Sequence, residues 1–143
     1  RKVLAEKTPI LGICLGMQLL GKGSEEAVSS GNSPGLGFID APFVKFSFPP
    51  TSGLKVPHMG WNTVSVKRAN PVLEQLDEEQ RFYFVHSYYA RCENPDDVIA
   101  TATYGHEFVC AYGHDNIVGT QFHPEKSHKF GMRLLKNFVT FAC

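Results

Sequence analysis

The apolar positions near the start of the chain fall into two patterns that meet at one cysteine. Residues 10–13 read Ile-Leu-Gly-Ile after a proline, and a short apolar run bounded in this way is typical of a buried strand. Residues 15–20 read Leu-Gly-Met-Gln-Leu-Leu, which predicts the first turns of a helix. We therefore expect a strand, a tight turn at Cys14, and a helix.

Much of the remaining chain consists of short runs with strand character. These runs are rich in β-branched and aromatic residues and are separated by Gly, Pro, Asn, Asp and His. The strands predicted in this way cover residues 38–39, 43–48, 63–66, 82–85, 98–103, 108–112 and 117–122.

The segments between these runs differ in character. Residues 2–7 are typical of the end of a helix, and residues 21–35 are polar and rich in Gly, Ser and Pro, which predicts a loop. Residues 49–53 predict a turn, and residues 71–76 predict one or two helical turns. Residues 55–62 are too irregular for either a helical or a strand period.

Residues 130–142 predict a helix that packs on the sheet. Its apolar face consists of Gly131, Leu134, Leu135, Phe138, Val139 and Ala142. Helices near both ends with mostly strands between them predict one three-layer α/β domain over residues 1–143, with an open mixed sheet. A sheet whose first strand leads directly into the cysteine turn is unusual. We therefore expect this domain to be N-terminally incomplete, without its first strands.

Composition and charge narrow the classes of function. Of the 143 residues, 43% are hydrophobic, and 14 Lys and Arg balance 14 Asp and Glu. This balance favours neither a nucleic-acid partner nor a membrane surface. No apolar run is long enough to span a bilayer. The four cysteines are dispersed, without a C-x-x-C pair, so we expect free thiols and a cytoplasmic location.

The turn at Cys14 has the pattern of a nucleophile elbow. Cys14 lies between Gly12 and Gly16, and in a strained strand-to-helix turn side chains at both flanking positions are expected to clash. The turn exposes the sulfur above the sheet, and the adjacent helix N-terminus is expected to favour the thiolate. The alternative is a buried core cysteine in a glycine-bounded turn.

A histidine that can serve as base follows the last predicted strand. His123 comes just after that strand, at the end where open α/β sheets place their sites. Such an imidazole can hold a thiolate and later protonate a leaving amine. Glu125 can turn back onto the imidazole because Pro124 stiffens the turn. The alternative is a structural, hydrogen-bonded histidine.

These motifs resemble those of the class I (triad) glutamine amidotransferase family. The likeness rests on Gly-Ile-Cys-Leu-Gly-Met-Gln at 12–18 and His-Pro-Glu at 123–125. Within the family, Pro-His-Met-Gly-Trp-Asn at 57–62, Phe-Val-His-Ser-Tyr at 84–88 and His-Pro-Glu-Lys-Ser at 123–127 are similar to the glutaminase subunits of imidazole glycerol phosphate synthases. The likeness covers nearly the whole chain.

The resemblance implies a glutaminase that works without a cofactor or metal. Cys14 would form a thioester with glutamine, His123 would protonate ammonia and activate water, and Glu125 would orient His123. The Leu15 backbone N–H would be an oxyanion donor. The positions matched to glutamine binding are Gln18, Glu26, Ser87 and Tyr88. From the residues alone, Gln18 could be a solvated helix residue, Glu26 a loop charge and Tyr88 a packing residue.

The resemblance also implies a partner. The family docks on a (β/α)8 cyclase that receives ammonia for imidazole glycerol phosphate synthesis in histidine biosynthesis, as a heterodimer. The matching surface comprises Pro57, Met59, Gly60, Trp61 and Asn62. An irregular segment with the only tryptophan suits an interface anchor. An ordinary core tryptophan is the alternative.

Two further alternatives remain open at this level, and two others are disfavoured. The segment 123–132 is also similar to paralogues encoded with surface-polysaccharide sugar-amination systems. The family's second oxyanion donor lies upstream of the cysteine, before the start of this chain, so a non-catalytic scaffold subunit is a further possibility. A cysteine peptidase is disfavoured because Gln18 and Glu26 suit a small polar substrate. Metal hydrolysis is disfavoured because the six histidines show no H-E-x-x-H spacing.

Overall fold

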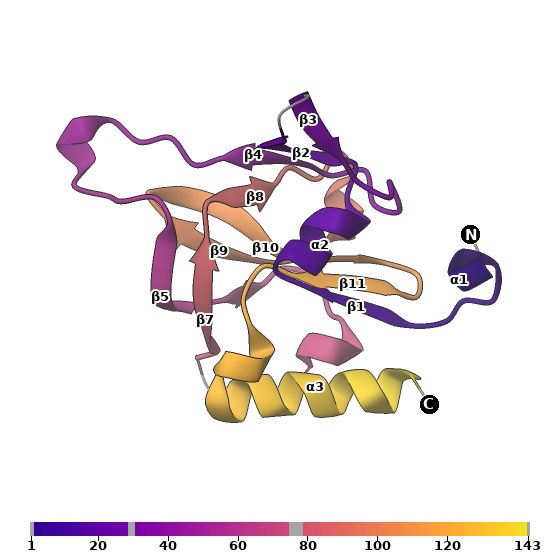
Figure 1. Cartoon of the computed structure of the whole chain (residues 1–143). Coiled ribbons are helices and arrows are strands. Elements are labelled where there is room, and N and C mark those ends of the chain that lie inside the picture. The colour runs from indigo at the N-terminus through magenta and orange to yellow at the C-terminus, as the bar shows by residue number, and fades with distance from the viewer. Residues whose placement is uncertain (1, 29–30, 75–78, 143) are drawn as a thin grey trace.

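The computed structural model describes residues 2–28, 31–74 and 79–142 (Figure 1). The helices are α1 (Lys2–Ala5), α2 (Leu15–Leu20) and α3 (His128–Ala142), with short 3₁₀ turns η1 (Pro50–Ser52), η2 (Pro71–Leu73), η3 (Pro95–Asp97) and η4 (Pro124–Lys126). The strands are β1 (Ile10–Ile13), β2 (Gly23–Val28), β3 (Gly31–Pro34), β4 (Pro42–Lys45), β5 (His58–Thr63), β6 (Ser65–Val66), β7 (Arg81–His86), β8 (Tyr88–Ala90), β9 (Val98–Tyr104), β10 (His106–His114) and β11 (Ile117–Thr120).

Within the described residues these strands form one large mixed sheet and a small second one. The large sheet runs β1-β11-β10-β8-β4-β2-β3, and β9 extends it beside β10 and β6. β1 and β11 are parallel, as are β2 and β4, whereas the other pairs are antiparallel. β5 and β7 form a separate antiparallel pair. The prediction of an open mixed sheet is confirmed.

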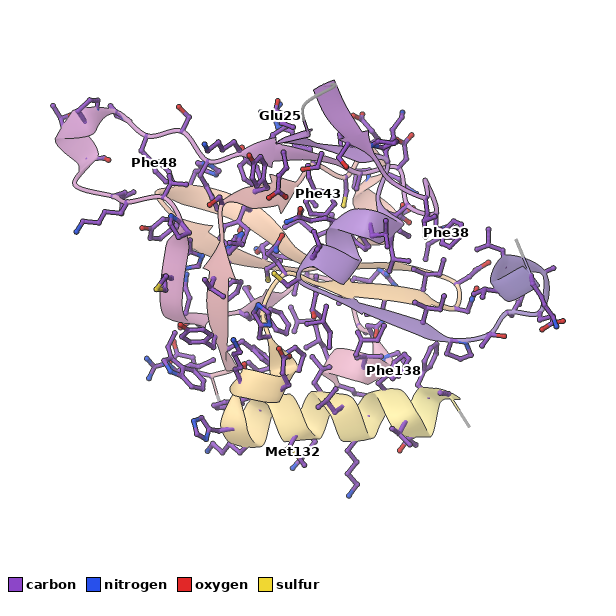
Figure 2. All side chains as sticks on the ribbon, viewed as in Figure 1. Glu25, Phe38, Phe43, Phe48, Met132 and Phe138 are labelled. Carbon is purple, nitrogen blue, oxygen red and sulfur yellow. The ribbon has the colours of Figure 1, made fainter. Side chains whose placement is uncertain are left out.

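Helices cover both faces of the sheet, which gives the predicted three layers. Adjacent residues of a strand point to opposite faces, and β11 shows this directly. Ile117 packs in the cluster that contains Met17 and Leu20 of α2, whereas Val118 packs in the cluster that contains Leu134 of α3. In Figure 1, α3 runs along one side of the sheet, and α2 lies on the other beside β1. Figure 2 shows side chains filling the space between these layers.

The C-terminal helix differs from its prediction in extent and in face. It begins at His128 rather than at 130. Leu134 is buried and Phe138 is half-buried against the core, but Val139 is 61% exposed and Ala142 is also exposed. The buried face is therefore displaced around the helix from the predicted one, because Phe130 and Phe141 pack against the core whereas Val139 and Ala142 do not.

Four strands, β2, β3, β5 and β8, lie in segments for which no strand was predicted. The backbone of 21–35, predicted as a loop, forms β2 and β3, because these segments pair with each other and with β4 although their sequence lacks an apolar alternation. β5 occupies the irregular segment 55–62. Its alternation is inverted, with His58 inside and Met59 and Trp61 outside.

The remaining predicted segments agree with the structure only in part. Residues 38–39 are not a strand. The predicted strand 63–66 is divided between the end of β5 at Thr63 and β6, with Val64 outside both strands. The predicted helical turns at 71–76 appear as η2, with residues 75 and 76 outside the described part. The three cysteines that the structure describes are free thiols. No helix among the described residues is long and apolar enough to cross a membrane.

Candidate active site

Two adjacent parallel strands bring the elbow and the histidine segment to one edge of the sheet. β1 and β11 pair with Ile13 opposite Thr120, and the Cys14 N–H donates to the Thr120 carbonyl at 2.8 Å. His123 follows β11 by three residues, and its N–H donates to the carbonyl of Tyr83 on β7 at 2.9 Å. Residues more than 100 positions apart in the sequence therefore meet beyond the carboxyl ends of two neighbouring strands.

The turn at Cys14 is a strained elbow. Cys14 adopts φ 52° and ψ −106°, a conformation that non-glycine residues rarely occupy and that concentrates at functional sites. A Cβ at Gly12 would lie 2.5 Å from Leu20 Cδ1 and 2.8 Å from the Gly16 backbone. The predicted clash at Gly16 is wrong, because a Cβ there would point into open space.

The sulfur of Cys14 is half-buried and hydrogen-bonded to distant parts of the chain. Its thiol donates to the Val85 carbonyl at 3.9 Å, and the Gln121 amide Nε2 donates to the sulfur at 3.8 Å. Burial raises the pKa of this thiol above its usual value, while the Leu15 N–H and Gln121 lower it less, and Glu125 and Glu26 add to the rise. The Leu15 N–H at the helix N-terminus lowers the pKa of the thiol, as expected, but desolvation by burial outweighs this effect, so the pKa is raised overall.

His123 and Glu125 form a tight pair on a clamped turn. The imidazole Nδ1 lies 2.5 Å from Glu125 Oε1, which leaves Nε2 as the nitrogen available to other groups. Ser127, fully buried, accepts the Tyr83 N–H at 3.0 Å and donates to the His123 carbonyl at 2.6 Å. Ser127 therefore fixes the turn to β7. Sequence reasoning included Ser127 in a motif but gave it no role.

The segment after Cys14 lines a pocket of about 410 Å³. Three of the predicted residues, Leu15, Gln18 and Glu26, lie together on its wall, with Leu19 and Ser24 among the others. Gln18 is buried, and within the described part of the chain its Oε1 has no hydrogen-bond partner. Glu26 is exposed. The pocket thus combines an unpaired amide oxygen with a carboxylate beside the elbow.

Ser87 and Tyr88 lie away from this pocket, at the corner between β7 and β8. They are not among the residues that line the pocket at Gln18. The Ser87 carbonyl accepts the Phe46 N–H at 2.9 Å, and the Tyr88 carbonyl accepts from His86 Nδ1 at 2.7 Å. The corner nevertheless follows Val85, whose carbonyl contacts the Cys14 thiol.

Two buried histidines hold this corner through one continuous chain of hydrogen bonds. Because His86 Nδ1 donates to Tyr88, its Nε2 accepts, and His58 Nδ1 donates to it at 2.9 Å. His58 Nε2 then accepts from Asn62 Nδ2 at 3.3 Å, and the same amide donates to the Thr103 carbonyl at 2.8 Å. Every nitrogen is satisfied with both rings neutral. Burial, as the main cause, lowers the pKa of His58 and of His86 to about 4.

The buried pair of His58 and His86 makes the stability of the fold sensitive to acid. The unfolded chain takes up protons on these residues as the pH falls below about 6.5, whereas the folded chain does so only near pH 4, so stability is lost across that interval. We expect the free energy of unfolding in urea to fall from pH 7.5 to pH 5.0 by about 2 kcal/mol for each buried ring. His58→Gln should flatten this slope. Exposed His106→Gln should leave it unchanged, and an equal slope in both variants would contradict the assignment.

The predicted interface residues lie on β5 and just before it, on the surface. Met59 is 63% exposed and Trp61 is 43% exposed, so Trp61 is not a core residue. Pro57 is exposed, and Gly60 and Asn62 are half-buried. The indole of Trp61 stacks on His128, the first residue of α3, with ring centroids 5.5 Å apart.

The donor set of the site is that of a nucleophile and base, not of a metal centre. Among residues 2–28, 31–74 and 79–142, no group of three or more His, Cys, Asp or Glu side chains could hold a metal ion. A half-buried thiol, an imidazole oriented by a carboxylate, and a polar pocket beside them can support acyl transfer from a small polar substrate. Sequence reasoning missed Gln121, although a glutamine within an otherwise apolar run was a usable signal.

Comparisons with known proteins agree with this chemistry. The family model for glutamine amidotransferase class-I matches residues 1–141. The chain is 53% identical to the imidazole glycerol phosphate synthase subunit HisH 2 of Methanococcus maripaludis over 142 residues, covering 99% of this chain and 67% of that protein. It is 51% identical to the subunit HisH 2 of Pseudomonas aeruginosa, covering 96% of this chain and 65% of that protein. The chain spans about two thirds of the length of these curated relatives.

Solved structures show the same fold. A glutamine amidotransferase structure superposes with a TM-score of 0.66 at 19% identity, covering 99% of this chain and 65% of that chain. A glutamine amidotransferase of Thermotoga maritima gives a TM-score of 0.60 at 21% identity, covering 98% of this chain and 49% of that chain.

Proposed function

The chain belongs to the class I glutamine amidotransferase family, and from this premise we propose that it hydrolyses glutamine for an imidazole glycerol phosphate synthase. Glutamine would yield glutamate and ammonia, and the ammonia would pass to a (β/α)8 cyclase in histidine biosynthesis, in the cytoplasm. The observation that carries the proposal is the position of Cys14 and of the paired His123 and Glu125 after two adjacent parallel strands, at the edge where Gln18 and Glu26 line a pocket.

The proposed reaction begins at the sulfur of Cys14. His123, oriented by Glu125, takes the proton of the thiol, and the sulfur attacks the side-chain carbonyl carbon of glutamine. The resulting oxyanion accepts the N–H of Leu15 at the elbow. The protonated imidazole gives its proton to the departing nitrogen, so that ammonia leaves and a γ-glutamyl thioester remains. The same imidazole then removes a proton from water, which attacks the thioester carbonyl. The C–S bond breaks, the sulfur takes the proton back from the imidazole, and glutamate leaves.

The pocket supports glutamine as the substrate. The exposed carboxylate of Glu26 can pair with the α-ammonium group, and the unpartnered Oε1 of Gln18 can accept an N–H from the substrate. A buried amide oxygen without a partner is costly in the free protein and is satisfied when a donor binds. Ser87 and Tyr88 would contact the glutamine substrate from the corner between β7 and β8.

The raised pKa of Cys14 supports control of this chemistry by the partner. With the thiol protonated at neutral pH, the nucleophile is weak. Docking of the cyclase would rearrange the groups around the sulfur, and we expect little ammonia to be released in its absence. The surface of Pro57, Met59, Gly60, Trp61 and Asn62 is our candidate for that docking, since it exposes two large apolar side chains.

The docking surface gives a direct prediction. Trp61→Ala should weaken binding to the cyclase about 30-fold, as expected for an aromatic anchor at an interface. The isolated chain should lose little stability, because the Trp61 side chain is exposed and its ring contacts with His128 and Tyr83 lie at the surface. Binding is measured by calorimetry and stability by thermal unfolding. Val139→Ala, another exposed apolar residue, is the matched control. A large loss of stability with unchanged affinity would contradict the assignment.

The function itself is tested by following glutamate release with the cyclase and its ligand present. We expect turnover that depends on both proteins, together with a thioester trapped at Cys14. Pull-down of a different barrel, acting on a sugar, would place the chain with the sugar-amination paralogues. Absence of a trapped thioester in the assembled complex would favour a scaffold subunit.

A further inference from the structure

Gln121 is a fully buried polar side chain beside the sulfur of Cys14. It follows β11 directly, and its backbone N–H donates to the Cys110 carbonyl at 2.8 Å, which fixes the residue to β10. Its side-chain Nε2 lies 3.8 Å from Cys14 Sγ. Within the described part of the chain, its Oε1 has no hydrogen-bond partner. A fully buried amide that leaves its oxygen unpaired calls for a functional explanation.

The Val85 carbonyl and the Gln121 amide act on the ionisation of the sulfur in opposite directions. The Val85 carbonyl accepts a hydrogen bond from the thiol, and this contact exists only while the sulfur carries its proton. The Gln121 N–H donates to the sulfur, and this contact strengthens when the sulfur becomes negative, because hydrogen bonds to ionised acceptors are the stronger ones. Gln121 is therefore the side chain placed to favour the reactive form.

The geometry also explains why a glutamine serves here. Val85 and the strand ends fix the sulfur from one side, and a donor is needed that carries no charge of its own. Burying the charge of a lysine or arginine in this position would carry a large desolvation cost. A neutral amide can donate the same hydrogen bond without burying a charge. The unpaired Oε1 is the cost of turning the N–H side of the amide toward the sulfur.

We propose that Gln121 is a positioning residue that holds the sulfur of Cys14 and stabilises its thiolate through an N–H hydrogen bond. This role rests on the proposed function of Cys14 as the nucleophile. Because the Gln121 side chain contacts the sulfur, we expect it to act on the pKa of Cys14. Glu125 of η4 and Glu26 of β2 oppose ionisation from other directions, and substitutions at Gln121 leave both in place.

The test measures the ionisation of Cys14 without using turnover. The whole chain is alkylated with iodoacetamide between pH 6 and 10, and the rate at Cys14 is followed by mass spectrometry of its peptide. Gln121→Met keeps the length of the side chain and removes the donor. We expect the apparent pKa of Cys14 to rise by about 1, which slows alkylation at pH 7 about tenfold. Gln121→Asn, which withdraws the amide from the sulfur, should act in the same direction.

Gln80 provides the matched control. It is also a buried glutamine with an unpartnered Oε1, and it precedes β7 in a different part of the molecule. Gln80→Met should destabilise the fold to a similar extent but leave the pH profile of Cys14 unchanged. An unchanged profile in both folded Gln121 variants would overturn the proposal.

The result is separable from the fate of the proposed function. If the assembled complex releases no glutamate but the alkylation profile shifts as expected, the proposed function fails and the positioning role stands. If glutamate is released and Gln121→Met lowers kcat with KM unchanged, both stand. Loss of turnover with an unshifted profile would make Gln121 a packing residue.

Discussion

Replacing Cys14 with serine should abolish glutamine hydrolysis, with a fall in kcat of at least about 10³-fold. A serine hydroxyl in the same elbow has a far higher pKa than the thiol, and the His123–Glu125 pair is arranged around a sulfur nucleophile. Synthesis driven by added ammonium should be preserved in the complex, because the acceptor chemistry belongs to the cyclase. Both rates are measured on the same preparation, with glutamine or ammonium as the nitrogen source.

Cys92→Ser is the matched control for this experiment. Cys92 is another half-buried thiol, and burial raises its pKa to about 12, so it is unreactive and its replacement should leave both rates unchanged. Loss of ammonium-driven synthesis in Cys14→Ser would indicate misfolding. Retention of more than about 1% of glutamine-dependent turnover would show that Cys14 is not the nucleophile.

The parts of the site that local rules describe could be predicted from the sequence. An apolar run, a glycine-flanked cysteine and a following helix are contiguous, so the elbow over residues 10–20 was visible as a pattern. His123 and Glu125 are two residues apart, and their pairing needs only a stiff turn. The parallel pairing of β1 with β11 is long-range, yet both strands end beside a chemically distinctive residue.

The environment of the sulfur could not be predicted in the same way. Val85 and Gln121 reach it from 71 and 107 residues away. Desolvation by burial also outweighs the lowering of its pKa by the Leu15 N–H at the helix N-terminus. β5 escaped prediction for a related reason. Its polar His58 is buried because Nε2 of His86 on β7 accepts a hydrogen bond from its Nδ1–H, so the usual alternation of apolar inside and polar outside is inverted. Such partners follow from tertiary pairing alone.

The candidate docking surface and the site are physically continuous. Trp61 stacks on His128, which begins α3 immediately after the turn that carries Glu125. On the other side of β5, Asn62 joins the hydrogen-bond chain through His58 and His86 to the Tyr88 carbonyl. Displacement of β5 by a partner would therefore act on both the histidine turn and the β7–β8 corner, the two segments that flank the sulfur.

The close contact between α3 and this turn gives the second large prediction. A Cβ at Gly131 would lie 1.7 Å from the Pro124 carbonyl oxygen and 2.6 Å from its carbon, both backbone atoms that cannot rotate away. Gly131→Ala must therefore separate α3 from η4. We expect a loss of about 3 kcal/mol or more in the free energy of unfolding, measured in urea.

Gly131→Ala should also reduce glutamine hydrolysis in the fraction that remains folded, because Pro124 lies between His123 and Glu125 and a shift of η4 separates that pair. Gly16→Ala is the matched helical control for stability, since its Cβ would meet open space and alanine is the better helix former. It should unfold at the same or a higher urea concentration. If Gly131→Ala were as stable as Gly16→Ala, α3 would not be pressed against the turn as the structure shows. If it were destabilised but fully active, the His123–Glu125 pair would not depend on the position of η4.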